Sequence, residues 1–260
     1  MRATIACGQF IPTSGDVPAN MALIRAQARE ARAAGASLLV LPELCLTGYP
    51  ARAEAAAWAV AGDGPEMARV RETAAGIGIG LCLGFIERLG PDRCANSMAC
   101  VDAAGTVCGI YRKVHLWPPE REWAAPGASF VPTEVAGIRA GMWICYDTRF
   151  PEAARSLARA GATLGLVGAA WFGPSEEWEL ALRARALDNG MFVAGATVLG
   201  AFGAAPFRGT SMIVDPHGTV LARAREGRAE VIHADYDSAV VEGFRARLPL
   251  LHDLRPDSYA

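Results

Sequence analysis

Short apolar runs alternate with amphipathic segments along the whole chain, and this pattern predicts strands interleaved with helices. The apolar runs predict strands at 3–9, 37–43, 78–88, 94–103, 106–113, 134–144, 163–169, 191–198, 210–214, 218–223 and 229–235. Segments of helical period predict helices at 17–35, 51–61, 65–76, 151–161, 176–189 and 237–246. No Ser/Gly linker, charge block or short repeat divides the chain, so we expect one domain over residues 1–260. Such an order favours an α/β protein with helices on the outer faces of its sheets.

Composition limits the classes of partner. Of the 260 residues, 52% are hydrophobic and 20% charged, which is enough apolar material for a large core. The net charge of −2, from 25 basic and 27 acidic residues, gives no long-range field for nucleic acid or an acidic membrane. The start MRATIACGQF lacks the apolar region of a signal peptide, and no window of membrane-spanning length is free of Gly and charge. We therefore expect a cytoplasmic protein without nucleic-acid or membrane partners.

Cysteine and histidine usage gives no sign of a bound metal. The seven cysteines are an odd number in a chain without a secretion signal, which favours reduced thiols over a disulfide framework. No CxxC, HxxxH or HExxH spacing occurs, and the glycines form neither GxGxxG nor a Walker loop. We expect no metal and no cofactor.

The segment GMWICYDTRFPE, at 141–152, places Cys145 at the point where an apolar run stops. Polar residues crowd the following turn, and Pro151 opens a segment of helical period. A thiol at the carboxyl end of a strand occupies the edge of the sheet where open α/β folds place their chemistry. Cysteine is also among the most buried residue types, so an inert core thiol is the alternative, and a nucleophile would need a base and an oxyanion site.

Two other polar residues follow predicted strands. Glu43 comes after the apolar LLVLP, so its carboxylate would be largely removed from water and suited to take up a proton. Lys113 comes after GIYR and could hold its charge beside Glu43 and polarise a carbonyl oxygen. The alternatives are a helix-capping or Arg-paired glutamate and an exposed lysine with a packed stem.

Three segments together resemble the signature segments of the nitrilase, or carbon–nitrogen hydrolase, superfamily: PELCLTGYP (42–50), YRKVHL (111–116) and GMWICYDTRFPE (141–152). The resemblance extends over most of the chain, including GATLGLVGAAW and RARALDNG. It implies a single-domain, four-layer α-β-β-α sandwich that assembles as a homodimer or higher homo-oligomer. The C-terminal tail, about 247–260, is a candidate for part of the subunit interface.

The resemblance also implies a catalytic triad of Glu43, Lys113 and Cys145. Glu43 would take the thiol proton, Cys145 would attack the carbonyl carbon, and Lys113 with the backbone N–H of Tyr146 would hold the oxyanion. A second carboxylate often assists in this family, six residues before a Pro-Gly. Glu120 has that spacing to Pro126, and we prefer it to its neighbour Glu122.

The same resemblance suggests the bond that is cleaved. True nitrilases usually carry Trp after the nucleophile, whereas this chain has Tyr146, which favours a small carboxylic acid amide or ω-amide as substrate. Arg149 matches an arginine that grips the substrate carboxylate in carbamoyl-amino-acid hydrolases, which makes N-carbamoyl amino acids the alternative. Its other interpretation is a salt bridge to Asp147 or Glu152.

The remaining candidate substrate-binding residues are Tyr49, Trp117, Trp171 and Phe172, although such aromatic residues are more often core than pocket. A nitrilase and a non-catalytic binding protein on the same fold are the weaker hypotheses. The second would be suggested by loss of a triad member, and all three members are present. A metal-dependent amidohydrolase is disfavoured by the scattered histidines.

Overall fold

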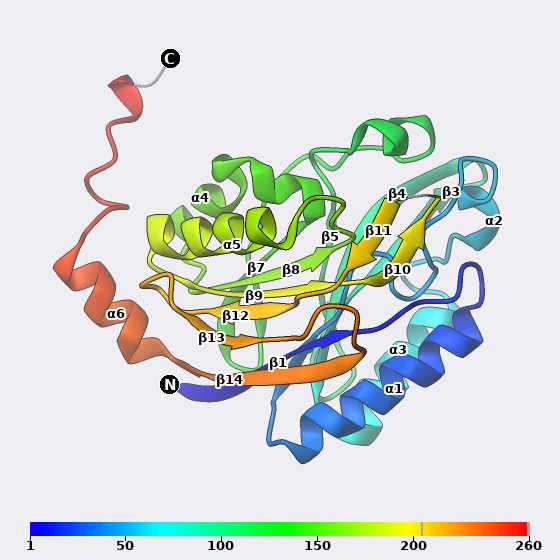
Figure 1. Cartoon of the computed structure of the whole chain (residues 1–260), viewed down its shortest axis with the longest axis horizontal. Helices are drawn as coiled ribbons and strands as arrows, with labels where there is room; N and C mark the ends of the chain where they lie inside the picture. The colour runs from blue at the N-terminus through cyan, green and yellow to red at the C-terminus, as the bar shows by residue number, and fades with distance from the viewer. Residues whose placement is uncertain (204, 259–260) are drawn as a thin grey trace.

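Two six-stranded sheets lie face to face in the computed structural model, which describes residues 1–203 and 205–258 (Figure 1). The first sheet has the order β14-β1-β2-β3-β4-β5 and consists of β14 (Glu230–Asp237), β1 (Arg2–Gln9), β2 (Leu38–Val40), β3 (Gly80–Gly90), β4 (Arg93–Val101) and β5 (Val107–Arg112). The second has the order β13-β12-β9-β8-β7-β6 and consists of β13 (Val220–Arg223), β12 (Met212–Val214), β9 (Phe192–Thr197), β8 (Leu164–Ala169), β7 (Ile138–Ile144) and β6 (Thr133–Val135). A separate hairpin pairs β10 (Leu199–Phe202) with β11 (Ala205–Arg208).

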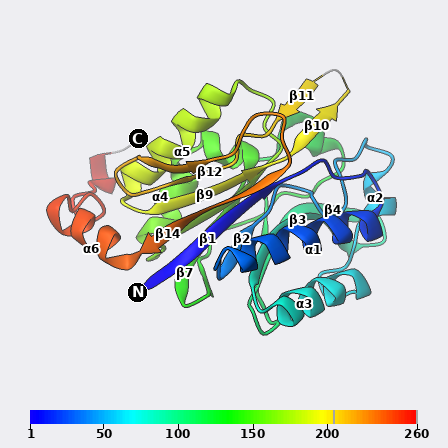
Figure 2. The ribbon, with the colours of Figure 1, turned by 60° about the horizontal axis from the view of Figure 1, so that its bottom comes forward.

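Helices cover the outer face of each sheet. Helices α1 (Val17–Ala33) and α3 (Pro65–Ile77) lie on the first sheet, and α4 (Pro151–Arg159) and α5 (Ser175–Asn189) lie on the second (Figure 2). The short α2 (Ala55–Trp58) flanks the first sheet, and α6 (Ser238–Arg247) leads to the C-terminal tail. The described residues also form three 3-10 helices: η1 (Pro118–Glu122), η2 (Cys145–Arg149) and η3 (Pro256–Ser258). This is the expected α-β-β-α layering.

The central strand β2 shows how the layers are built from the sequence. Successive side chains of a strand point to opposite faces, so an entirely apolar strand can serve two cores. Leu38 and Val40 pack in the core that includes the space between the sheets, whereas Leu39 packs in the core beneath α1. Because both faces are covered, the chain leaves this strand in a buried environment, and Glu43 follows there.

The structure corrects two predicted elements and adds one that was not predicted. The Ala-rich 51–61 segment is helical only over α2, because Val60 leaves the helix and pairs with β3, donating to the Ile86 carbonyl at 2.9 Å. The predicted 134–144 strand is two strands, β6 and β7, joined by a tight turn in which Ala136 and Gly137 have φ of 51° and 73°. The β10–β11 hairpin is absent from the prediction, because its Gly/Ala/Pro-rich sequence lacks a clear alternation of apolar and polar residues.

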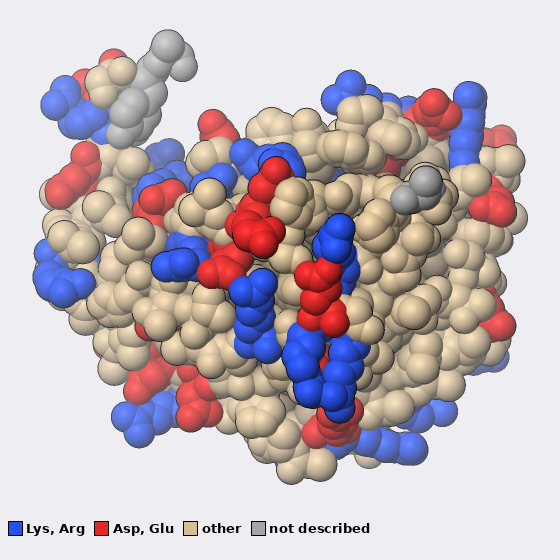
Figure 3. Space-filling view, viewed as in Figure 1, with Lys and Arg blue, Asp and Glu red and all other residues tan. Residues whose placement is uncertain are grey.

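The surface fits the small net charge. Basic and acidic side chains are interspersed over the face seen in Figure 3, with neither sign forming a large separate field. Among the described residues, no helix is both long and apolar enough to cross a membrane. Within the same part of the chain, no group of three His, Cys, Asp or Glu side chains could hold a metal ion.

Candidate active site

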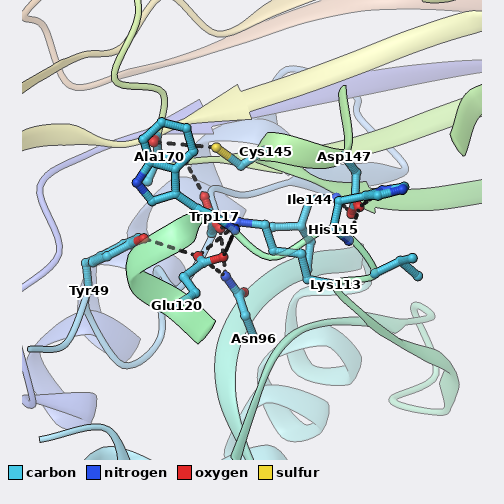
Figure 4. Close-up of polar contacts among 12 residues, drawn as sticks. Tyr49, Asn96, Lys113, His115, Trp117, Glu120, Ile144, Cys145, Asp147 and Ala170 are labelled. Carbon is cyan, nitrogen blue, oxygen red and sulfur yellow. Dashed lines mark hydrogen bonds and ion pairs between the residues drawn. The ribbon is translucent and has the colours of Figure 1, made fainter. Parts of the chain in front are cut away.

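The three predicted triad residues come together where their strands end. Glu43 follows β2 and Lys113 follows β5 in the first sheet, while Cys145 follows β7 in the second. Figure 4 shows the Lys113 and Glu120 side chains and the Cys145 sulfur converging on one region between the sheets. The site therefore depends on the stacking of the two sheets, since neither sheet carries all three side chains.

Cys145 lies at a strained turn. Its φ is +43°, in the left-handed region that non-glycine residues rarely adopt. Its Sγ donates to the Ala170 carbonyl at 3.5 Å, and the residue is 8% exposed. Burial raises the pKa of this thiol well above its usual value, the charges of Glu43 and Glu120 raise it further, and Lys113 lowers it. At neutral pH the resting group is a thiol, which needs a base before it can attack.

Glu43 is fully engaged on both carboxylate oxygens. Oε1 accepts from Lys113 Nζ at 2.7 Å and from Asn96 Nδ2 at 2.7 Å, and Oε2 accepts from the Ala170 backbone N–H at 2.7 Å. Ala170 therefore contacts the carboxylate through its N–H and the Cys145 thiol through its carbonyl. One residue of the β8 end thus holds the candidate base and the candidate nucleophile next to each other.

Lys113 is a buried cation between two carboxylates. Its Nζ lies 2.7 Å from Glu43 Oε1, and 2.9 and 2.8 Å from the two oxygens of Glu120. Burial alone would lower its pKa, but the attraction of Glu120 and Glu43 outweighs burial and holds the pKa above the usual range. The ammonium stays charged, which is the state that can hold an oxyanion.

Glu120, rather than Glu122, lies with the triad. Glu120 is fully buried and accepts from Asn96 Nδ2 at 2.8 Å, from Tyr49 Oη at 3.1 Å and from the Trp117 N–H at 2.9 Å. Burial raises its pKa, an effect that Lys113 opposes. The Glu122 side chain is 57% exposed and lies 3.8 Å from Arg52. The geometry agrees with the preference drawn from the Pro-Gly spacing.

The sequence interpretation missed two members of this network. Asn96, in the middle of β4, donates through its Nδ2 to both Glu43 and Glu120 and so bridges the two carboxylates. The available signal was Asn96 itself, a polar residue with an amide side chain in the middle of a strand that is otherwise rich in Cys, Ala, Met and Val. Ala170 has no side-chain chemistry, so its role through the backbone left no mark on the sequence.

A cavity of about 270 Å³ opens next to this network. Glu43, Tyr49 and Ala170 line its inner end. Apolar and aromatic side chains line much of the remainder: Ile11, Pro12, Trp58, Val198, Leu199, Phe202 and Phe207. The β10–β11 hairpin contributes several of these residues, so the unpredicted hairpin forms one wall of the cavity.

The predicted aromatic residues separate into two groups. Tyr49 packs on Phe172, with ring centroids 6.1 Å apart, and Phe172 stacks on Trp117 at 5.9 Å. These three rings adjoin the triad through the hydrogen bonds of Tyr49 and Trp117 to Glu120. Trp171 is only 5% exposed and packs on Trp178. Of the four predicted aromatic residues, only Tyr49 is among the described residues that line the cavity.

Arg149 has a partner that the sequence interpretation did not foresee. Its Nη2 donates to Glu177 Oε2 at 2.6 Å, and its guanidinium lies 4.6 Å from the centre of the Trp171 ring. The alternative interpretation, a salt bridge to Asp147 or Glu152, named the wrong partner. Helix α5 presents Glu177 to the arginine, and the Asp147 carboxylate accepts from Tyr111 and His115. Arg149 does not line the cavity.

Comparison with known proteins identifies the class. Residues 4–246 match the carbon–nitrogen hydrolase family, and the chain belongs to it. A probable nitrilase of Schizosaccharomyces pombe is 32% identical over 266 residues, covering 100% of this chain and 98% of that protein. The 2-oxoglutaramate amidase of Bacillus subtilis is 32% identical over 263 residues, covering 100% of each chain.

Solved structures agree with these relatives. A variant of the amidase from Nesterenkonia sp. AN1, in complex with acrylamide, matches with a TM-score of 0.88 and 29% identity over 98% of this chain and 95% of that one. The nitrilase-like fold and the family resemblance are thereby confirmed. The protein is an amide-hydrolysing enzyme of this family.

Proposed function

We propose that this enzyme hydrolyses a small amide to a carboxylic acid and ammonia through a thioester on Cys145. The observation that carries the proposal is the contact of Ala170 with both Cys145 and Glu43, with Lys113 Nζ 2.7 Å from the same carboxylate. A nucleophile, a base and a cation are thus adjacent in a site removed from water, as acyl transfer requires.

Acylation begins when Glu43 takes the thiol proton and Cys145 Sγ bonds to the carbonyl carbon. The carbonyl electron pair moves to oxygen, where Lys113 and the Tyr146 backbone N–H stabilise the charge. Each such donor contributes about 10²–10³ in rate. Glu43 then gives its proton to the departing nitrogen, because an amide ion is too basic to leave, and ammonia is released from the thioester.

Deacylation reuses the same groups. Glu43 removes a proton from water, and the resulting hydroxyl attacks the thioester carbon through a second oxyanion. The C–S bond breaks, the sulfur regains the proton held by Glu43, and the carboxylic acid leaves. Water adds one hydroxyl and one hydrogen in the whole cycle, and the enzyme returns to its starting state.

Glu120 would assist the reaction through its negative charge and its contact with Lys113. One ammonium faces two carboxylates in this network, so a proton taken by the pair relieves an excess negative charge. Glu120 also contacts Lys113 Nζ through both of its carboxylate oxygens, at 2.9 and 2.8 Å. We assign it the role of an assisting carboxylate that keeps Lys113 charged while Glu43 gains and loses protons.

The lining of the cavity favours an uncharged acyl group. Among its described lining residues there is no Lys, Arg or His, while Glu43 and Glu54 both contribute carboxylates. Placing a substrate carboxylate there would leave it without a partner, which is costly in a poorly hydrated site. We therefore favour small neutral carboxylic acid amides over ω-amides. N-carbamoyl amino acids remain the alternative if Arg149 leaves Glu177 to bind substrate.

A substrate panel tests this function. Ammonia release would be measured for neutral aliphatic amides, ω-amides of matched length, N-carbamoyl amino acids and nitriles, with Cys145→Ala as control. We expect kcat/KM to be highest for the neutral amides and Cys145→Ala to be inactive. Full activity of the variant would overturn the mechanism, and a preference for carboxylate-bearing amides would overturn the substrate assignment.

We also propose that the enzyme acts in the reducing cytoplasm as a homodimer or higher homo-oligomer, with the tail at the interface. All seven cysteines are free, and Leu248 and Leu250 are exposed where the tail leaves α6. Light scattering of the full chain and of a chain ending at Arg247 would test the assembly. The same number of subunits per particle in both chains would contradict the role of the tail.

A further inference from the structure

We propose that Asp147 is a positioning residue that fixes the loop carrying Lys113 against the turn carrying Cys145. This inference rests on the proposed function, because it concerns the same nucleophile and the same cation. Asp147 follows Cys145 by two residues but points away from it, toward the end of β5. Nothing in the proposed reaction requires a further carboxylate at this point, so its full burial needs another explanation.

Four donors surround the Asp147 carboxylate. Oδ1 accepts from the backbone N–H of His115 at 2.8 Å and from His115 Nδ1 at 2.9 Å. Oδ2 accepts from Tyr111 Oη at 2.6 Å and from the backbone N–H of Ile144 at 3.0 Å. Charge-assisted hydrogen bonds of this kind are the strong ones in proteins, and four together define the place of each donor.

These donors flank the two catalytic candidates. Tyr111 and His115 stand two residues before and after Lys113, and Ile144 directly precedes Cys145. Lys113 belongs to the first sheet and Cys145 to the second, so Asp147 ties the two sheet edges together at the site. The distance between the cation and the sulfur then depends on one buried carboxylate as well as on the packing of the sheets.

The rest of the cluster supports the same function. Tyr111 Oη also accepts from the Val114 N–H at 3.2 Å, so the phenol closes a loop around Lys113. Burial and the charge of Asp147 raise the pKa of Tyr111, which keeps it a donor. The ring of His115 stacks on Phe150 with centroids 3.7 Å apart, which holds its Nδ1 toward Asp147.

His115 is placed to orient rather than to take a proton from the nucleophile. In Figure 4, His115 and Asp147 lie together beside Lys113, whereas the Cys145 sulfur points away from them toward Ala170. The backbone of Cys145 is strained, with φ of +43°, and needs restraints such as the hydrogen bonds of Asp147. Such a conformation persists only where the surroundings over-determine it, and the Ile144 hydrogen bond is one of those restraints.

The variant Asp147→Asn tests this role with little change of shape. Each oxygen of the Asp147 carboxylate accepts from two donors, whereas the amide of Asn has only one oxygen. Its NH₂ group must therefore face the two donors that one of the carboxylate oxygens accepted from. Tyr111 or His115 Nδ1 can adapt by becoming an acceptor, but the backbone N–H of Ile144 or His115 in that pair cannot. The substitution therefore removes the hydrogen bond either from the Ile144 N–H, next to Cys145, or from the His115 N–H, near Lys113.

We expect kcat of Asp147→Asn to fall about 10- to 100-fold, with KM within about threefold of wild type, because small misplacements of reacting groups have effects of this size. Asp215→Asn is the matched control, since Asp215 accepts from two backbone N–H groups at the distant β12–β13 turn. Val70→Ala in α3 is the control for lost stability alone, because Val70 is buried in the outer core. Both controls should keep the wild-type kcat.

Tyr111→Phe provides the second variant in case Asp147→Asn does not fold. It removes one donor from Asp147 and one acceptor from Val114, and we expect kcat to fall about tenfold at unchanged KM. An unchanged kcat in either folded variant, or an equal loss in Val70→Ala at a matched melting temperature, would overturn the inference. Activity of Cys145→Ala would instead overturn the proposed function, so the two failures are distinct.

Discussion

The ammonium of Lys113 donates to the carboxylate of Glu43 at 2.7 Å, and each side chain is only 1% exposed. Removing two charges from water is expensive unless geometry and further hydrogen bonds compensate. Here Asn96 and Ala170 donate further hydrogen bonds to the Glu43 carboxylate, and Glu120 is a second carboxylate partner of Lys113. The buried ion pair is therefore a part of the fold as well as a candidate for chemistry.

Replacing Lys113 by Met should reveal both roles. The substitution leaves two buried carboxylates without a cation, so we expect a loss of about 3–5 kcal/mol in the free energy of unfolding. Activity should fall at least about 10²-fold, because an oxyanion donor is lost. Urea unfolding and steady-state kinetics would measure the two effects.

Arg52→Met is the control for this prediction. Arg52 and Glu122 form an exposed ion pair, 3.8 Å apart, with side chains 73% and 57% exposed. Exposed pairs are worth little, so its unfolding free energy should change by less than about 1 kcal/mol. Equal destabilisation by the two substitutions would contradict the view that Lys113 is a compensated buried charge.

Glu120→Gln and Glu122→Gln form a matched pair two residues apart. The amide introduced by Glu120→Gln would place an NH₂ group against Lys113, Asn96 or the Trp117 N–H, and it would remove the excess negative charge. We expect kcat of Glu120→Gln to fall about 10²-fold or more, whereas Glu122→Gln should retain wild-type kinetics. Similar kinetics in the two variants would sink the assignment of Glu120.

The sequence was sufficient to predict the layers and the catalytic candidates. Glu43, Lys113 and Cys145 each lie at or just past the end of a predicted strand, and strand ends in layered α/β proteins converge on one edge. It could not predict contacts made through backbone atoms, such as those of Ala170, because any residue type offers the same N–H and carbonyl. The β10–β11 hairpin was also missed, because its sequence has no clear alternation and its Phe202 packs on Tyr49, a residue far away along the chain.

The ion-pair partner of Arg149 also could not be predicted from the sequence. A nearby carboxylate such as Asp147 or Glu152 is the natural guess, but α5 brings Glu177 to the guanidinium from 28 residues away. Long-range ion pairs depend on how helices pack, which local spacing does not encode. Only the structure separates a free arginine from one that already has a carboxylate partner.

Arg149→Ala decides whether this arginine grips substrate. One possibility is that Arg149 only forms the salt bridge to Glu177 of α5. The variant should then keep the ratio of kcat/KM for a neutral amide to kcat/KM for an ω-amide of matched length within about twofold of wild type. Ammonia release from the two substrates gives this ratio. A loss of activity confined to the carboxylate-bearing amide would instead show that Arg149 binds the carboxylate of the substrate.

Alkylation of Cys145 tests the state of the thiol. Burial raises its pKa above the usual 9.0, so the thiolate fraction is small below that value and grows about tenfold per pH unit. In Glu43→Gln, which lacks the base, the alkylation rate with iodoacetamide should rise through pH 7–9 without a plateau. Mass spectrometry of the modified peptide would give the rate, and a plateau below pH 9 would show that burial, the largest cause of the shift, does not hold the pKa above its usual value once the charge of Glu43 is removed.

The most direct measurement is the covalent intermediate itself. Wild-type enzyme turning over a small neutral amide would be quenched in acid and digested with trypsin, which releases residues 140–149 as one peptide containing Cys145 as its only cysteine. We predict that this peptide gains the mass of the acyl group less one hydrogen, and that Cys145→Ala shows neither this adduct nor turnover. Sustained ammonia release by Cys145→Ala, or an acyl group on another residue, would contradict the account.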